Sequence, residues 1–349
     1  MNWTAGEQTT TAPRISYRMN SFLRRNRWWF FLLLLLSMVA ATQSVAGQTE
    51  NTDGITLEAE AGFDGIARQN DWLPVTVNVA NSGPSVTGEI RVLLQGSGAS
   101  ELVYSTPLAL PNQSNKQVTL PVFLPAFLGR GLVVQLVDEA GRPVIETSVA
   151  PQLQLSQDDR LYGVVSDAPA DLDFLENVTG PRSRAAVAYL AVDDIPETGA
   201  ALDPLDVLVF TNVDSGRLND RQLAAIREWV ATGGQLIVTG GLTGPQTSAA
   251  LAPLLPVSTG GSRPVDDLPE LRQATGVEFR DPGPYVLTEA SLTQGEALLL
   301  HESTPVLARR PQGNGSVTFL ALDPNVAPLL DWAGNETFWA TVVPPDQPR

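Results

Sequence analysis

Acidic side chains follow several of the apolar segments that the sequence predicts as buried strands. They are Asp167, Asp193, Asp194, Asp214 and Asp323. In an open sheet the carboxyl ends of parallel strands lie along one edge, and ligands bind outside that edge. Carboxylates there could hold a cation or a sugar. Aspartate also caps helices and turns well, and we favour this structural role.

Thr239-Gly240-Gly241 ends another predicted strand, and the N–H groups of this segment could bind an anion. The segment has no phosphate-binding lysine, and the negative charge of the chain opposes phosphate. We therefore interpret the glycines as residues of a tight turn. The candidate cleft predicted at the strand ends consists of Asp167, Asp194, Asp214, Thr239, Gly240, Gly241 and Asp323.

A serine hydrolase is one catalytic alternative. The only histidine, His301, could act as the base for Ser166 or Ser215. Neither serine lies in a G-x-S-x-G turn, and the sequence offers no evident acid to orient His301. We therefore expect His301 to face solvent at the end of a strand. A pair of carboxylates is the other way in which this chain could hydrolyse a substrate.

The sequence contains no cysteine, which excludes thiolate nucleophiles and cysteine-ligated metals. We expect no catalytic residue, no cofactor and no metal site, and therefore no enzyme. Tryptophan rings could form a sugar-binding platform, so a glycan-binding module is a further hypothesis. We expect these rings to lie in the core instead; they are Trp72, Trp229, Trp332 and Trp339.

The charge of the chain limits its partners. Among 349 residues, 38 are acidic and 22 are basic, which gives a formal net charge of −16. Nucleic-acid binding depends on Lys and Arg to neutralise phosphates, so we exclude it. Anionic lipid headgroups are repelled for the same reason. We expect contact with a membrane only through the N-terminal segment or through partners.

The N-terminal segment has the pattern of an export signal. Arginines precede an uncharged run at residues 28–41. A helix of this length spans about 21 Å, less than the roughly 30 Å hydrocarbon core of a bilayer. Ser44-Val45-Ala46 then supplies the small residues that a signal peptidase recognises. We expect residues 1–46 to be a signal peptide; retention of residues 28–41 as an anchor in the cytoplasmic membrane is the alternative.

After a polar linker at residues 47–54, residues 55–150 alternate between apolar and polar side chains. Val75, Val77 and Val79 illustrate this period of two. Turn signals separate such runs and give about seven short strands. The pattern predicts an all-β immunoglobulin-like sandwich, with a jelly roll as the alternative.

Residues 157–343 change to continuous apolar runs. Asp206–Phe210 has the composition of a buried parallel strand. Asn219 and Gln222 can form a capping box at the start of the next helix, and Gln235–Thr239 is the following strand. Such a βαβ unit predicts a mostly parallel, flavodoxin-like α/β sheet. A glycine-rich turn further along the chain adds a β-hairpin to this sheet.

Three segments resemble one superfamily. Residues 205–241 are similar to the central unit of the class I glutamine amidotransferase-like superfamily and read LDVLVFTNVDSGRLNDRQLAAIREWVATGGQLIVTGG. Residues 304–324, TPVLARRPQGNGSVTFLALDP, resemble a late hairpin of its branches in bacterial envelope proteins. Residues 62–92, GFDGIARQNDWLPVTVNVANSGPSVTGEIRV, resemble the domain that often precedes these branches. Active members carry a cysteine where this chain has Gly240, so the resemblance implies a noncatalytic domain.

The leading functional hypothesis is a noncatalytic interaction or scaffold protein of the bacterial cell envelope. Such a protein would present its sandwich and its amidotransferase-like domain outside the cytoplasm to other envelope proteins. The alternatives are an extracytoplasmic hydrolase with a Ser/His or carboxylate site and a glycan-binding module. Two carboxylates about 5 to 9 Å apart in a cleft would favour the hydrolase. An exposed row of aromatic rings would favour the glycan-binding module.

Export predicts a mature chain that begins at or near Gly47, because the small residues before it fit the peptidase. N-terminal sequencing of the protein from the extracytoplasmic fraction measures this directly. Recovery of a chain that still begins at Met1 in the cytosol would contradict the prediction.

Overall fold

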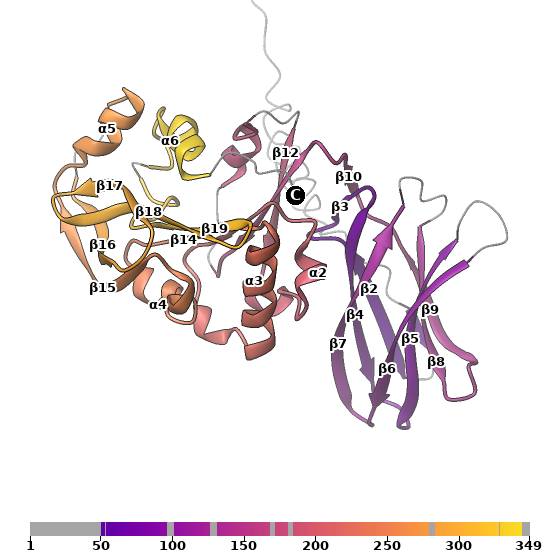
Figure 1. Ribbon diagram of the computed structural model, residues 1–349. Coiled ribbons are helices and arrows are strands. Elements are labelled where there is room, and N and C mark those ends of the chain that lie inside the picture. The colour runs from indigo at the N-terminus through magenta and orange to yellow at the C-terminus, as the bar shows by residue number, and fades with distance from the viewer. Residues whose placement is uncertain are drawn as a thin grey trace, which may run out of the picture. The chain divides into compact units, whose positions relative to one another are not determined.

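The computed structural model describes the chain in separate ranges, which are residues 50–52, 54–95, 101–125, 131–167, 172–180, 184–278, 283–327 and 329–343 (Figure 1). Residues Gly47–Arg349 form one compact unit. The predicted signal segment and its cleavage site lie outside the described residues. Within those residues, no helix has the length and apolar character needed to cross a bilayer.

Two antiparallel four-stranded sheets form the first part of this unit. One sheet has the order β1 (Glu50–Thr52), β2 (Ile55–Ala61), β4 (Asp71–Asn81), β7 (Ser114–Leu124). The other has the order β6 (Glu101–Leu110), β5 (Val86–Gln95), β8 (Leu132–Asp138), β9 (Pro143–Val149). Alternate side chains of both sheets, such as Val77 and Val92, are fully buried in a shared core. The period of two in the sequence therefore records which side chains face this core.

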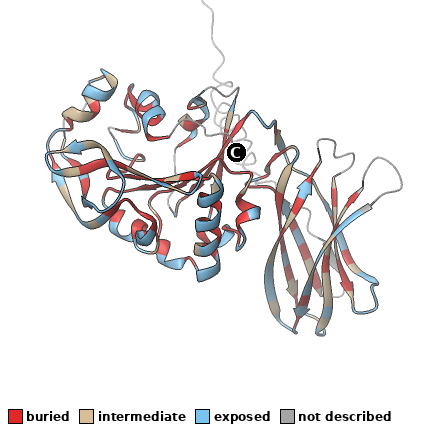
Figure 2. Cartoon of the chain, viewed as in Figure 1, coloured by how far each residue is buried: buried red, intermediate tan, exposed pale blue. Residues whose placement is uncertain are grey.

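A mixed seven-stranded sheet forms the second part. Its order is β12 (Ala185–Leu190), β11 (Arg160–Val165), β13 (Val207–Phe210), β14 (Gln235–Thr239), β19 (Gly315–Leu320), β18 (Thr304–Gln312), β17 (Glu296–His301). The first five pair in parallel, whereas β18 and β17 are antiparallel to their neighbours. Every residue of β11, β13 and β14 is buried (Figure 2), which explains their continuous apolar sequences.

Helix α3 (Asp220–Thr232) joins β13 to β14 and has the predicted cap. The Asn219 side chain accepts hydrogen bonds from the Arg221 and Gln222 N–H groups at 2.9 and 3.0 Å. The Gln222 side chain in turn accepts one from the Asn219 N–H at 3.0 Å. The helix ends at Gly233, which has a positive φ of 134°. Its Trp229 ring is 1% exposed and packs against the backbone of Gly234.

The remaining helices are short. They are α2 (Gly199–Leu202), α4 (Gly244–Ser248), α5 (Pro269–Thr275), α6 (Asn335–Val342) and the 3-10 turns η2 (Asp173–Asn177), η3 (Val192–Asp194), η4 (Ser215–Arg217) and η5 (Ala252–Leu254). Of the described residues, 19% are in helices and 48% in strands. The described part of the chain is therefore mostly β.

The predicted fold class, an immunoglobulin-like sandwich followed by a flavodoxin-like α/β domain, is wrong. The sheets are antiparallel or mixed, and helices do not dominate either face of the large sheet. The connection from β14 to β19 explains the difference, because it contains an antiparallel ribbon of β15 (Val257–Val265) and β16 (Tyr285–Leu292) and then β17. The sequence gives only a weak signal for β15, since it reads VSTGGSRPV, with two glycines at its centre and no apolar alternation.

A buried ion pair ties the two parts of the unit together. Short strands β3 (Ile66–Arg68) and β10 (Leu153–Leu155) pair in parallel beside it. The guanidinium of Arg68 donates to both carboxylate oxygens of Asp206, and these side chains are only 7% and 11% exposed. Asp206 also accepts the Leu161 N–H at 2.8 Å, at the start of β11. This buried ion pair therefore joins the two predicted domains, residues 55–150 and residues 157–343.

The substitution Arg68→Met is expected to lower the free energy of unfolding by about 3 to 5 kcal/mol, because it leaves a buried carboxylate without its countercharge. The double variant Arg68→Met/Asp206→Asn should be more stable than Arg68→Met alone, since the asparagine oxygen can still accept the Leu161 N–H. Urea unfolding curves of the wild type, of both single variants and of the double variant measure the four free energies. Arg142→Met, in the exposed pair with Asp138, is the control and should have a far smaller effect. Losses that simply add in the double variant would contradict the coupling.

Candidate functional site

The predicted acids do gather at the carboxyl edge of the parallel strands. Asp167 follows β11, Asp193 and Asp194 lie in η3 after β12, and Asp214 precedes η4 after β13. Asp323 follows β19. Asp167 and Asp193 form one group around Arg217, and Asp323 lies in a second group with Asn212. The side chains of Asp194 and Asp214 cap nearby turns.

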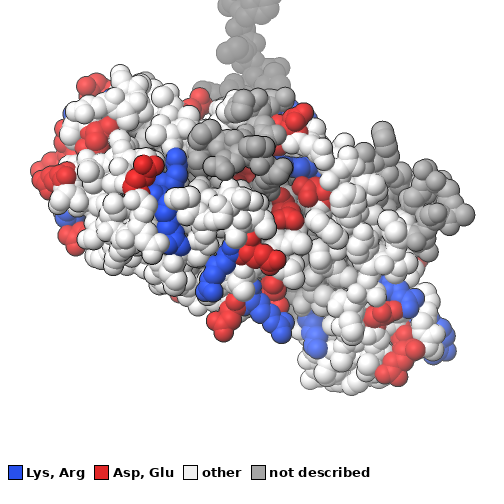
Figure 3. Space-filling view, in the orientation of Figure 1, with Lys and Arg blue, Asp and Glu red and all other residues white. Residues whose placement is uncertain are grey.

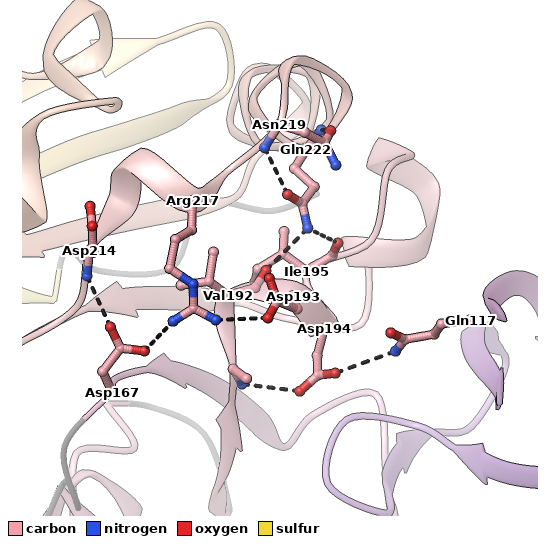
Figure 4. A network of polar contacts seen from close by, with 11 residues as sticks. Gln117, Asp167, Val192, Asp193, Asp194, Ile195, Asp214, Arg217, Asn219 and Gln222 are labelled. Carbon is pink, nitrogen blue, oxygen red and sulfur yellow. Dashed lines mark hydrogen bonds and ion pairs between the residues drawn. The ribbon is translucent and has the colours of Figure 1, made fainter. Parts of the chain in front are cut away.

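Arg217 bridges the acids of two neighbouring strand ends (Figure 4). Its guanidinium donates to Asp167 Oδ1 and to Asp193 Oδ2, each at 2.7 Å. The contacts with Asp193, and then with Asp167, raise the pKa of Arg217. The Asp214 N–H donates to the second oxygen of Asp167 at 3.2 Å. One cation and one backbone donor therefore occupy these two carboxylates.

Asp214 and Asp194 act as turn caps. The Asp214 side chain accepts the Gly216 N–H at 2.9 Å and so begins η4. The Asp194 side chain accepts the Ala191 N–H at 3.2 Å, and Gln117 Nε2 donates to its other oxygen at 3.4 Å. These contacts are the helix and turn caps that we favoured for the acids.

The second group surrounds Asp323, which is 8% exposed. Asn212 Nδ2 donates to both of its oxygens at 2.9 and 3.0 Å, and the Asn325 N–H donates at 2.8 Å. Burial raises the pKa of Asp323, while the hydrogen bonds from Asn325 and Asn212 lower it in part. Asn212 Oδ1 accepts the Thr243 hydroxyl at 2.7 Å, so a chain of polar contacts leads from Asp323 to the segment after β14.

The segment Thr239-Gly240-Gly241 has no donors to spare for an anion. The N–H groups of Gly240 and Gly241 donate to Leu322 O and Ala321 O at 3.2 and 3.1 Å. The Thr239 hydroxyl donates to Thr211 Oγ1 at 2.9 Å within the core. These bonds continue the pairing of β14 with β19 beyond the last residues of both strands.

Glycine is required at both positions of this turn. A Cβ at Gly240 would lie 2.5 Å from Ala321 O, and one at Gly241, with φ of 83°, would lie 2.6 Å from the Asp323 Cβ. Tight packing against the end of β19 therefore excludes a side-chain nucleophile at residue 240.

The sequence missed an acid that contacts the histidine. His301 Nδ1 lies 3.1 Å from Glu270 Oε1 on α5. The His301 and Glu270 side chains are 15% and 12% exposed, so the prediction of a solvent-facing histidine is wrong. Since Glu270 lies 31 residues earlier, on a helix that the sequence did not predict, no local motif could have identified it.

Ser215 is not a nucleophile in this arrangement. It is fully buried, its hydroxyl donates to Gln246 O at 3.2 Å, and it accepts the Ala250 N–H at 3.0 Å. Within the described ranges, no cluster of three or more His, Asp or Glu side chains has a geometry that could hold a metal ion.

The four tryptophans in the described part of the chain do not form a row of exposed rings. Trp229, Trp332 and Trp339 are at most 5% exposed and belong to the core of the large sheet. Trp72 is half-buried on β4 and meets the rings of Phe123 and Tyr104 edge to face, at centroid distances of 5.9 and 6.5 Å. Edge-to-face rings pack against each other and do not present the flat surface on which a sugar stacks.

Two family models match parts of the chain. Residues 54–152 match a domain of unknown function, DUF8726, and residues 187–325 match another, DUF7408. No curated protein matches the chain.

Solved structures resemble parts of the chain weakly. The exo-beta-1,4-mannosidase Op5Man5 from Opitutaceae bacterium strain TAV5 is 15% identical over 52% of this chain and 34% of the mannosidase, with a TM-score of 0.34. A beta-glucosidase from Listeria innocua is 18% identical over 30% of this chain and 16% of the glucosidase, with a TM-score of 0.20. The sporulation control protein Spo0M from Bacillus subtilis is 10% identical over 28% of this chain and 50% of Spo0M, with a TM-score of 0.19. At these scores the likenesses carry no inference about function.

The substitution Asn212→Gly tests the group around Asp323. It removes both hydrogen bonds to Asp323 and the one that Asn212 accepts from Thr243, and it keeps the positive φ of 48° accessible. We expect the pKa of Asp323 to rise further and the free energy of unfolding to fall by about 1 to 3 kcal/mol at neutral pH.

The sign of the pH dependence follows from the raised pKa of Asp323. The folded state binds the proton of the Asp323 carboxyl more tightly than the unfolded state does. The stabilisation that this proton gives the folded state is present at low pH and is lost as the pH rises through the folded pKa. The loss caused by Asn212→Gly should therefore shrink as Asp323 becomes protonated. Urea unfolding at about pH 4 and about pH 7 measures this. Gln113→Gly, at another positive φ of 55°, is the control and should show no such pH dependence.

Proposed function

We propose that this chain is an exported, noncatalytic protein of the cell envelope that acts by binding other envelope proteins. The observation that carries the proposal is the occupied carboxyl edge of the parallel strands, where Arg217 holds Asp167 and Asp193 at 2.7 Å. In open α/β sheets this edge is the usual position of a reactive site. Here its polar groups serve to hold the protein together.

The chemistry of acyl transfer supports the same proposal. Acyl transfer needs a nucleophile, a positioned base and donors for the oxyanion. Gly240 has no side chain, and the N–H groups of Gly240 and Gly241 already donate to the end of β19. Hydrolysis by two carboxylates needs one of them to deliver a proton to the substrate. Asp167 and Asp193 instead share one guanidinium.

Support for export comes from the sequence. An arginine-containing stretch precedes a short apolar run and then small residues at Ser44-Val45-Ala46. The net charge of −16 suits protein partners better than nucleic acid. On the face drawn in Figure 3, basic groups lie beside acidic ones and do not form a continuous basic surface.

A hydrolase is the second candidate, because His301 and Glu270 form a pair of the kind that orients a catalytic base. This candidate requires a nucleophile near His301 Nε2. It would lie away from the Arg217 group, on the opposite margin of the large sheet, where β17 is the last strand.

The noncatalytic proposal predicts no turnover by the full chain of glutamine, peptides or activated esters above the background rate, because no activated nucleophile and oxyanion site occur together. Continuous assays of the purified protein and of His301→Ala measure this. Equal background rates in both proteins are the expected result. Turnover that disappears in His301→Ala would refute the proposal and establish the hydrolase.

Binding is tested separately in cells. A photoreactive side chain at position 242 can capture a partner at the carboxyl edge, since Leu242 is 77% exposed there. The same group at the exposed Ser148 of β9 is the control. A crosslink to a defined envelope protein from position 242 alone is the expected result. Recovery of the whole chain in the cytosol would contradict the envelope assignment.

A further inference from the structure

We propose that a polar groove beside the β15–β16 ribbon binds a neutral saccharide. The groove has a volume of about 390 Å³, which lies within the usual range for small-molecule sites. It is lined by Ser258, Thr259, Gly260, Glu289, Ala290, Ser291, Ser303 and Thr304. These residues come from both strands of the ribbon and from the turn between β17 and β18, and Figure 1 draws these four strands next to one another.

A glycine bulge opens the groove. The pairing of β15 with β16 shifts register between Thr259 and Ser262, where Gly260 and Gly261 are inserted. A Cβ at Gly260 would lie 3.5 Å from the Glu289 Cβ and 3.7 Å from its Oε2. The Glu289 carboxylate therefore lies over the bare backbone of the bulge. Any side chain larger than a methyl group at position 260 would fill this space.

The groove presents hydroxyl groups from two sides. Ser258 and Ser291 face each other across the ribbon, and Ser303 and Thr304 lie in and after the turn opposite. None of these four hydroxyls makes a hydrogen bond to another described residue, so all four can bond a ligand. The Thr259 Oγ1 lies 3.0 Å from the Ser248 Oγ, so this hydroxyl already has a hydrogen-bond partner within the protein.

The charges around the groove select a ligand without negative charge. Arg263 Nε lies 3.9 Å from Glu289 Oε1, and its terminal nitrogen lies 3.4 Å from Glu302 Oε2. Two carboxylates thus share one guanidinium, and the net charge of these three side chains is negative. An anionic ligand would be repelled, whereas Glu289 Oε2 can accept hydrogen bonds from a neutral polyol.

The lining distinguishes a saccharide from a peptide. Peptide grooves supply apolar pockets for side chains, but Ala290 is the only apolar side chain in this lining. Hydroxyl and carboxylate groups instead match the dense hydroxyl groups of a sugar. No aromatic ring lines the groove, so we expect weak binding, with a Kd on the order of 1 mM.

The inference is independent of the proposed function. The groove lies on the ribbon and the β17–β18 turn, whereas that proposal rests on the carboxyl edge of β11, β12 and β13. Failure to detect saccharide binding would not change the expected crosslinking from position 242. Detection of turnover in the activity assays would not change the expected binding of a saccharide.

Saturation-transfer NMR and calorimetric titration of the full chain with maltotriose, cellotriose and chitotriose test the proposal. At least one of these sugars should bind saturably. Ser291→Leu, from the ribbon, and Ser303→Leu, from the turn, should each weaken that sugar about tenfold or more, because each removes a hydroxyl and fills the groove. Both positions are exposed, so the variants should fold.

Ser148→Leu is the matched control, since Ser148 is an exposed strand serine outside the groove. Its affinity for the sugar should equal that of the wild type. Three results would overturn the proposal. These are no saturable binding of any of the three sugars, binding that survives both groove substitutions, and glucuronate binding as tightly as the neutral sugars.

Discussion

The ion pair between Arg68 and Asp206 is the contact on which the rest of the unit depends. It places a charged pair in a buried position, where attraction must offset a large desolvation cost. Asp206 offsets part of that cost by also accepting the Leu161 N–H. Because Leu161 belongs to β11, a fully buried strand of the large sheet, the carboxylate that binds Arg68 also holds the start of this strand.

At the carboxyl ends of the parallel strands, where open α/β sheets often have a reactive site, the polar side chains make hydrogen bonds within the protein. Arg217 and Asn212 each bind two carboxylate oxygens there. The turn after β14 lies so close to β19 that only glycine fits at positions 240 and 241. The polar groups at this edge therefore bond mainly to one another. Exposed hydroxyl groups occur instead along the groove beside the β15–β16 ribbon.

Features that neighbouring residues determine were predictable from the sequence, whereas contacts between distant residues were not. Helix α3 and strand β14 were predictable because the Asn219–Gln222 capping box and the continuous apolar run of the strand are both local. The gathering of acids at one edge was also predictable from strand polarity. The partners of these side chains were not predictable. Arg217 lies 50 residues from Asp167 and 24 residues from Asp193, and Glu270 lies 31 residues from His301. The prediction of the fold class failed for a related reason, because β15 has two central glycines and gives a weak strand pattern, and it pairs with β16 only across an intervening helix.

The pairing of β3 with β10 imposes an order on assembly. Its partners are separated by almost the whole sandwich, and Phe63 beside β3 is buried in the core of the large sheet. During synthesis β3 emerges from the ribosome long before β10 and β11. Until those strands arrive, the apolar side chain of Phe63 has no core to enter and stays exposed on the nascent chain. Contact with a chaperone would matter most during that interval.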